Sequence, residues 1–94
     1  MTGPAEMFLK HAANIVAERH AQYGDASAAM AILAARWSAT LGHTVTPAQV
    51  VLCLIDLKLA RLAHDPAHED SAVDVCGYAA VLRELLETST SDGR

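Results

Sequence analysis

The sequence predicts an all-α protein that folds as a four-helix antiparallel bundle. Its 94 residues are enough for one domain near the small end of the usual range. Hydrophobic residues make up 52% of the chain but aromatic residues only 4%, so the apolar content is mostly Ala, Leu and Val. Such residues suit close helix packing better than a sheet core. No segment alternates apolar and polar residues as a half-buried strand does, and four segments with helical spacing are joined by short connections.

The first helix is expected over about residues 4–21. Pro4 suits the first turn of a helix, where its missing N–H group has no partner to lose. Gly24 follows the helix and is well suited to a left-handed C-terminal cap. The apolar positions with helical spacing are Phe8, Ala12, Ile15 and Val16.

The second helix is expected to begin after Asp25 or Ser27 and to run to about Leu41. Either side chain is a good N-terminal cap. Gly42 then ends the helix. An apolar stripe for the core consists of Met30, Leu33, Trp37 and Leu41.

The third helix has the clearest start in the chain. Thr46 is followed by Pro47 and, three positions after the threonine, by Gln49, which predicts a capping box. The helix is expected to extend to about Ala63. It is apolar nearly all round, as expected for a central element of a bundle.

The fourth helix is expected after a short loop at 64–69 that Pro66 interrupts. Asp70 or Ser71 is the expected cap, and the helix should continue to about Glu87. The domain is therefore predicted over residues 1–87, followed by a polar, frayed tail at 88–94.

The third and fourth helices carry more apolar side chains than one buried stripe needs. We therefore expect a homo-oligomer that buries the excess through these two helices. The alternative is that both helices lie at the centre of the bundle, in which case a monomer suffices.

Charge and hydropathy exclude several classes of function. The net charge is −4 and the basic residues form no run, which argues against nucleic-acid binding. No apolar stretch approaches the about 18 residues that a membrane span needs. Because the N-terminus also lacks a signal-peptide pattern, we expect a cytoplasmic protein.

Carboxylates on apolar helices are the first candidates for a site. Asp70 and Asp74 are four residues apart and share a helix face with Tyr78, whereas Asp56 lies in the middle of the third helix. Hard cations such as Mg²⁺ bind carboxylate oxygens, so these three aspartates are predicted as metal ligands. If the two helices pack antiparallel, Asp56 and Asp74 are expected to face each other. For Asp70 and Asp74 the alternative is helix capping.

Basic and aromatic residues supply candidates for ligand binding. Lys58 and Arg61 are three residues apart and are predicted to clamp a phosphate, with salt bridges to nearby acidic residues as the alternative. Arg19 is a further phosphate ligand candidate, and Tyr23 and Tyr78 are candidates for contact with a base or sugar.

Spaced motifs in the chain resemble a family of small helical proteins from bacteriophages and prophages. The motifs are Arg-x-x-x-Tyr-Gly-Asp at 19–25, Leu-Lys-x-x-Arg at 57–61 and Asp-Ser-x-x-Asp-x-x-Gly-Tyr-Ala at 70–79. This resemblance implies a phage origin, and hence a place in the bacterial host cell. More remotely, the chain resembles MazG-type all-α nucleoside triphosphate pyrophosphohydrolases, which hold Mg²⁺ on acidic pairs from two adjacent helices. Asp74, Asp70 and Asp56 match those pairs only in part.

These observations predict a protein that binds a nucleotide or another phosphorylated small molecule. It is expected to act as a Mg²⁺-dependent pyrophosphohydrolase-like protein or, alternatively, as a non-catalytic oligomer that sequesters a nucleotide. A third alternative is a protein-interaction module. The sequence leaves the choice between catalysis and binding open.

Overall fold

Four helices make up the computed structural model of the protein, which describes the backbone of residues 3–93 and the side chains of residues 3–87. They are α1 (Pro4–Tyr23), α2 (Ala26–Leu41), α3 (Pro47–His64) and α4 (Glu69–Gly93). No strand occurs in this described part of the chain. The predicted all-α fold with four helices is therefore confirmed.

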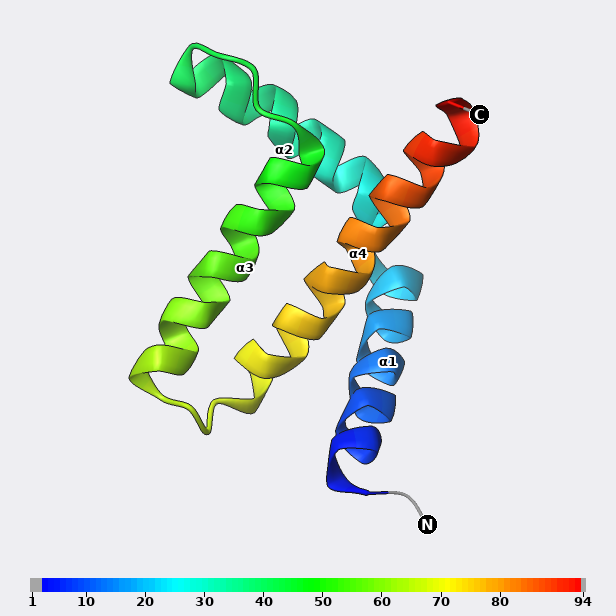
Figure 1. Ribbon diagram of the computed structural model, residues 1–94, viewed down its shortest axis with the longest axis vertical. Coiled ribbons are helices and arrows are strands. Elements are labelled where there is room, and N and C mark those ends of the chain that lie inside the picture. The colour runs from blue at the N-terminus through cyan, green and yellow to red at the C-terminus, as the bar shows by residue number, and fades with distance from the viewer. Residues whose placement is uncertain (1–2, 94) are drawn as a thin grey trace.

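Helix α4 is the helix against which the others assemble. It packs against α1, α2 and α3, whereas α3 packs against α2 and α4. Figure 1 shows α3 and α4 as an antiparallel hairpin, with α1 on the opposite side of α4 and α2 crossing one end of the hairpin. The sequence placed α3 at the centre because of its apolar composition, but α4 occupies that position.

The helix ends follow from local capping chemistry. The Thr46 side chain accepts a hydrogen bond from the Gln49 backbone N–H, and the Gln49 side-chain Oε1 accepts one from the Thr46 backbone N–H, so the capping box is confirmed. Asp25, rather than Ser27, caps α2 by accepting from the Ser27 backbone N–H. Gly42 ends α2 in the left-handed conformation. Gly24 ends α1 with a positive φ of 84°, but its ψ of −156° lies outside the left-handed helical region predicted for it.

The start and the end of α4 differ from the prediction. His68 caps the helix, because its Nδ1 atom accepts the backbone N–H of Ser71 at 3.2 Å. Asp70 and Ser71 therefore lie inside the first turn. The backbone of α4 continues to Gly93, past the expected end at Glu87, because no proline interrupts it. The side chains of the expected tail, 88–94, lie outside the described residues.

The main core lies where α2, α3 and α4 meet. Its buried members come from α2 and α3, and half-buried side chains from α4 close it. Trp37 packs against this core as predicted, but Leu41 at the end of the predicted stripe is exposed. The buried members are Met30, Ala34, Val50 and Val51. On the other side of α4, Ala12 is the buried residue of α1.

Candidate functional site

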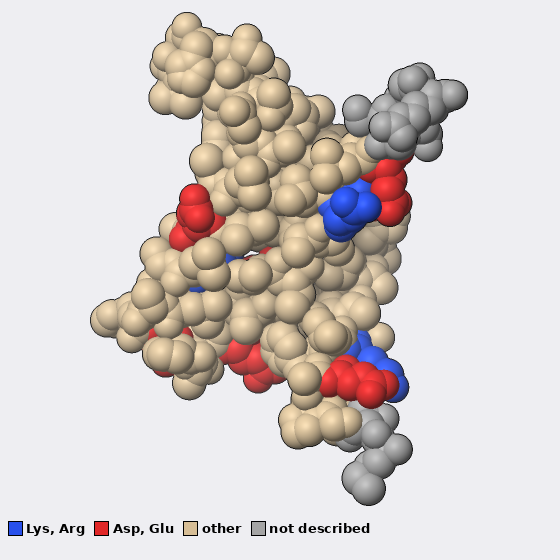
Figure 2. All heavy atoms as spheres, viewed as in Figure 1, with Lys and Arg blue, Asp and Glu red and all other residues tan. Residues whose placement is uncertain are grey.

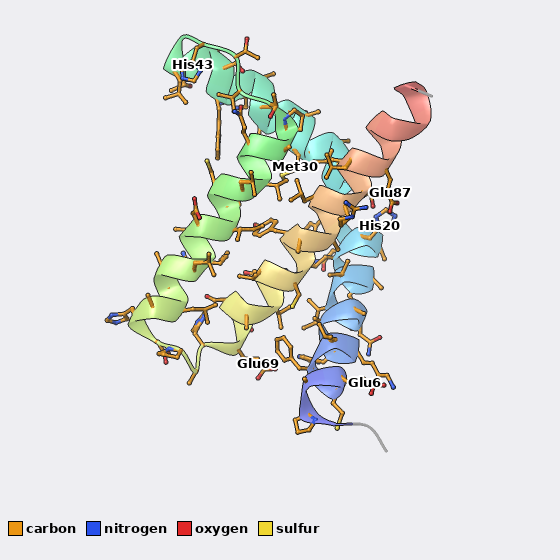
Figure 3. All side chains as sticks on the ribbon, in the orientation of Figure 1. Glu6, His20, Met30, His43, Glu69 and Glu87 are labelled. Carbon is orange, nitrogen blue, oxygen red and sulfur yellow. The ribbon has the colours of Figure 1, made fainter. Side chains whose placement is uncertain are left out.

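A cleft of about 770 Å³ lies between α1 and α4, within the size range of small-molecule sites. Two motifs that are about 50 residues apart in the sequence line it together. The end of α1 contributes Arg19, Tyr23 and Gly24, and α4 contributes Asp74 and Tyr78. The α2 end of the cleft is marked in Figure 3 by the labelled residues His20 and Met30, which also line it.

Asp74 on α4 forms ion pairs with basic side chains from two other helices. Its Oδ1 atom accepts a hydrogen bond of 2.7 Å from Nη1 of Arg19 on α1, and its Oδ2 atom lies 2.9 Å from Nζ of Lys58 on α3. The Asp74 and Lys58 side chains are only 14% and 13% exposed, whereas the Arg19 side chain is 49% exposed. The three side chains therefore form a charged cluster, with Arg19 as its solvent-facing member.

Electrostatics keeps this carboxylate charged. Burial raises the pKa of Asp74, but hydrogen bonds from Arg19 and Lys58, together with their positive charges, outweigh burial and hold that pKa below its ordinary value. The hydrogen bond to Asp74 in turn raises the pKa of Arg19. Asp74 is thus ionised at neutral pH and can orient the guanidinium.

Helical spacing explains why these side chains point into one cleft. Arg19 and Tyr23 are four residues apart on α1, and Asp74 and Tyr78 are four apart on α4, so each pair shares a helix face. Between them, α4 carries Gly77, whose missing side chain leaves room above α1. A Cβ atom there would lie 3.4 Å from Cγ2 of Val16, an ordinary contact, so glycine is not required for helix packing at this position.

A known protein family matches most of the chain, including the residues that line the cleft. The model of a family described as a domain of unknown function, DUF6378, matches residues 7–86. The chain belongs to the DUF6378 family. The family match includes both motifs that line the cleft and every residue predicted here as a metal or ligand contact.

A phage relative supports the predicted origin. The chain is 38% identical over 69 residues to the gene 55 protein of Mycobacterium phage L5. The aligned region covers 72% of this chain and 44% of that relative, so the chain spans less than half the length of the phage protein. No solved structure matches the chain. The relationship to phage proteins is confirmed, and the remote resemblance to MazG-type enzymes stays a prediction.

The two tyrosines of the DUF6378 cleft differ in their surroundings. Tyr78 is half-buried and packs against the main core, so the fold positions its ring. Tyr23, at the last turn of α1, is 76% exposed. One tyrosine is thus a wall of the cleft, and the other lies at its open edge.

Arg61 does not join Lys58 in a phosphate clamp. Lys58 points inward to Asp74, whereas Arg61 is exposed and lines a separate hollow of about 410 Å³ at the α3–α4 loop. A spacing of three keeps the two residues on neighbouring parts of the α3 surface, but the ion pair to Asp74 directs Lys58 inward while Arg61 stays at the exposed hollow. The other residues that line this hollow are Leu57, Ala60, His64, Asp65 and His68.

The three predicted metal ligands are not brought together within one chain. Asp56 is exposed on α3, two residues from the inward-pointing Lys58, and residues two apart on a helix point in nearly opposite directions. Asp56 therefore does not face Asp74, and the prediction that these two carboxylates face each other is wrong. Asp70 is exposed in the first turn of α4. Among the side chains that the structure describes, no three of the types His, Cys, Asp and Glu are arranged to hold a metal ion.

The sequence did not predict that Ser27 links α2 to α4 at the end of the cleft formed by Asp25 and Glu84. The Ser27 backbone N–H donates to Asp25 at 3.0 Å, and its hydroxyl donates to Glu84 of α4 at 2.5 Å. Both carboxylates line the cleft. The pairing of Ser27 with Glu84 spans 57 residues, and no local spacing predicts it.

Proposed function

We propose that the cleft between α1 and α4 binds a nucleotide or another phosphorylated small molecule. The observation that carries this proposal is the half-exposed Arg19 guanidinium, which Asp74 orients inside a cleft with a tyrosine on each side. Each part has a distinct role in the proposal.

Arg19 is the proposed phosphate ligand. A guanidinium has five N–H donors, and Asp74 takes one of them through Nη1. The remaining donors are available to phosphate oxygens, for which the planar fork is well suited. Lys58 neutralises much of the charge on Asp74, so the net charge of the cluster stays positive.

The rest of the cleft suits an organic group. Most of its wall is apolar, and Tyr23 and Tyr78 offer aromatic faces for a base. Glu84 does not compete at the phosphate position, because it is ten residues beyond Asp74, or about 15 Å along α4. Asp25 lies at the same end of the cleft, since Ser27 binds both Asp25 and Glu84. The remaining apolar wall is formed by Ala13, Val16, Ala17, Ala26, Ala29, Met30, Ala80 and Val81.

Binding is proposed ahead of hydrolysis. The predicted Mg²⁺ ligands Asp56, Asp70 and Asp74 do not converge, and Asp74 already has two cationic partners. The donor set of one chain therefore does not fit a Mg²⁺ site built from these three residues. The titration described next also distinguishes magnesium-dependent pyrophosphate hydrolysis from binding without catalysis.

Calorimetric titration tests the proposal. The purified protein is titrated with nucleoside mono-, di- and triphosphates and with inorganic phosphate, each with and without Mg²⁺. We expect saturable binding of at least one nucleotide, weakened by about tenfold or more in Arg19→Gln because a charge-assisted contact is lost. Arg36→Gln, on α2 and outside the cleft, is the matched control and should bind as the unaltered protein does.

Analysis of the ligand afterwards separates the two outcomes. Recovery of unchanged nucleotide supports sequestration, and release of pyrophosphate only with Mg²⁺ supports hydrolysis. No binding across the panel, or equal weakening in the Arg19 and Arg36 variants, contradicts the proposal.

A further inference from the structure

We propose that Lys58, which lies on α3 outside the cleft, is a positioning residue for Arg19 and keeps its guanidinium available to a phosphate. This role rests on the proposed binding of a phosphorylated ligand between α1 and α4, and it extends that site to a helix on the opposite side of α4. Lys58 itself does not line the cleft. Its effect on a ligand therefore passes through Asp74.

Lys58 is a basic residue whose side chain α3 directs inward. The side chain is only 13% exposed, and its Nζ atom lies 2.9 Å from Oδ2 of Asp74. Figure 2 shows uncharged atoms over most of the side of the molecule formed by α2 and α3. A charge withdrawn from water is costly without a partner, and Asp74 supplies that partner. Lys58 is thus committed to Asp74 and not to a ligand.

The two oxygens of Asp74 are divided between two cations. Oδ1 accepts a hydrogen bond of 2.7 Å from Nη1 of Arg19, whereas Oδ2 pairs with Lys58. The carboxylate of an aspartate turns readily about its last side-chain bond, and both of its oxygens can bind one guanidinium as a bidentate pair. Because Lys58 holds Oδ2, Arg19 gives Asp74 one N–H group and keeps the others for a ligand.

Without Lys58, Asp74 would compete with the phosphate for Arg19. Oδ2 could then turn toward the guanidinium, and the bidentate pair would occupy a second donor that the ligand needs. The charge would change as well, because two basic residues with one aspartate leave one positive charge, whereas the Arg19–Asp74 pair alone is neutral. Both changes weaken the attraction for an anion.

NMR of the arginine side chains tests the positioning role in the ligand-free protein. In the unaltered protein, we expect one guanidinium nitrogen of Arg19 to show the shift of an N–H group bound to a carboxylate. In Lys58→Met two nitrogens should show it, and Lys58→Arg, which keeps the positive charge, should restore the single one. Arg61→Met removes a positive charge from an exposed position three residues along α3, so it is the matched control and should leave the Arg19 signals unchanged.

Calorimetric titration tests the consequence for binding, with ATP, GTP, CTP, UTP and inorganic phosphate as the probes. For a probe that the unaltered protein binds, Lys58→Met should raise the dissociation constant about tenfold, because a donor and a positive charge are lost at the phosphate position. Lys58→Arg should stay within about threefold of the unaltered protein, and Arg61→Met should not differ from it. Circular dichroism at the titration temperature confirms that each variant is folded.

The outcomes separate the role of Lys58 from the proposed function. If the affinity falls in Arg19→Gln but not in Lys58→Met, the cleft binds the probe and the role of Lys58 is refuted. The same role is refuted if Lys58→Met weakens binding while a single shifted nitrogen of Arg19 persists, because Lys58 then only joins α3 to α4. Absence of binding by the unaltered protein refutes the proposed function itself, and the role of Lys58 with it.

Discussion

The Lys58 ammonium on α3 lies 2.9 Å from the Asp74 carboxylate on α4, and both side chains are nearly withdrawn from solvent. The second oxygen of the same carboxylate binds Arg19 on α1. One aspartate thus connects three helices and also forms part of the cleft wall. Its removal should therefore affect both stability and the proposed binding.

Asp74→Asn should lower the free energy of unfolding at neutral pH by about 1–3 kcal/mol. The amide keeps the size of the side chain but leaves Lys58 poorly solvated and without its negative partner. Urea unfolding measures the change. Asp56→Asn is the control: because Asp56 is exposed, we expect a change within about 0.5 kcal/mol, and an equal loss in both variants would contradict the role of the ion pairs.

The stabilisation by Asp74 should depend on pH in a definite direction. The pKa of Asp74 is lowered in the folded state, so its contribution is complete above the ordinary aspartate value of about 3.9 and is lost as the pH falls through the folded value. The stability difference between the unaltered protein and Asp74→Asn should therefore shrink below about pH 4. Unfolding curves at neutral and acidic pH test this, and a difference that stays constant would refute it.

Lys58→Met should raise the pKa of Asp74 relative to the unaltered protein. Methionine keeps most of the apolar stem, but it removes a hydrogen bond and a positive charge that lower this pKa. An NMR titration of the Asp74 side-chain carboxyl carbon measures the shift. Arg61→Met serves as the control, because Arg61 lines the other hollow, and it should leave the titration of Asp74 unchanged.

Gly77→Ala should stabilise the protein by about 0.5–1 kcal/mol. Alanine is the better helix former, and its Cβ would meet Val16 at an ordinary distance of 3.4 Å. Thermal unfolding measures the gain. Destabilisation would show that α1 and α4 pack more tightly at this point than the structure indicates.

Gly24→Ala should destabilise the protein by about 1–3 kcal/mol. Gly24 has φ +84° and ψ −156°, a conformation that is nearly exclusive to glycine. No atom lies within 4 Å of the added Cβ, so the loss reports the backbone alone. Gly42→Ala, in the left-handed helical region, should cost less, about 1–2 kcal/mol, and the reverse order would contradict this reasoning.

Half of the candidate site was predictable from the sequence. Arg19 with Tyr23, and Asp74 with Tyr78, are pairs set by helical spacing, and the structure places both pairs in one cleft. The positions of Arg61 and Asp56 could not be predicted, because the direction of a side chain around α3 depends on which side of that helix meets α4. The Lys58–Asp74 ion pair shows which side of α3 faces α4.

The sequence by itself determined the four helices and most of their ends, because capping and turn chemistry act over a few residues. Thr46 with Gln49, and the glycines at 24 and 42, are local signals of this kind. Only the tertiary structure decided that α4 is central, that Asp74 is shared between Arg19 and Lys58, and that one side of α3 faces solvent. These features depend on packing between segments that are distant in the chain. When a helix is apolar on all sides, its sequence does not indicate which side the other helices will cover.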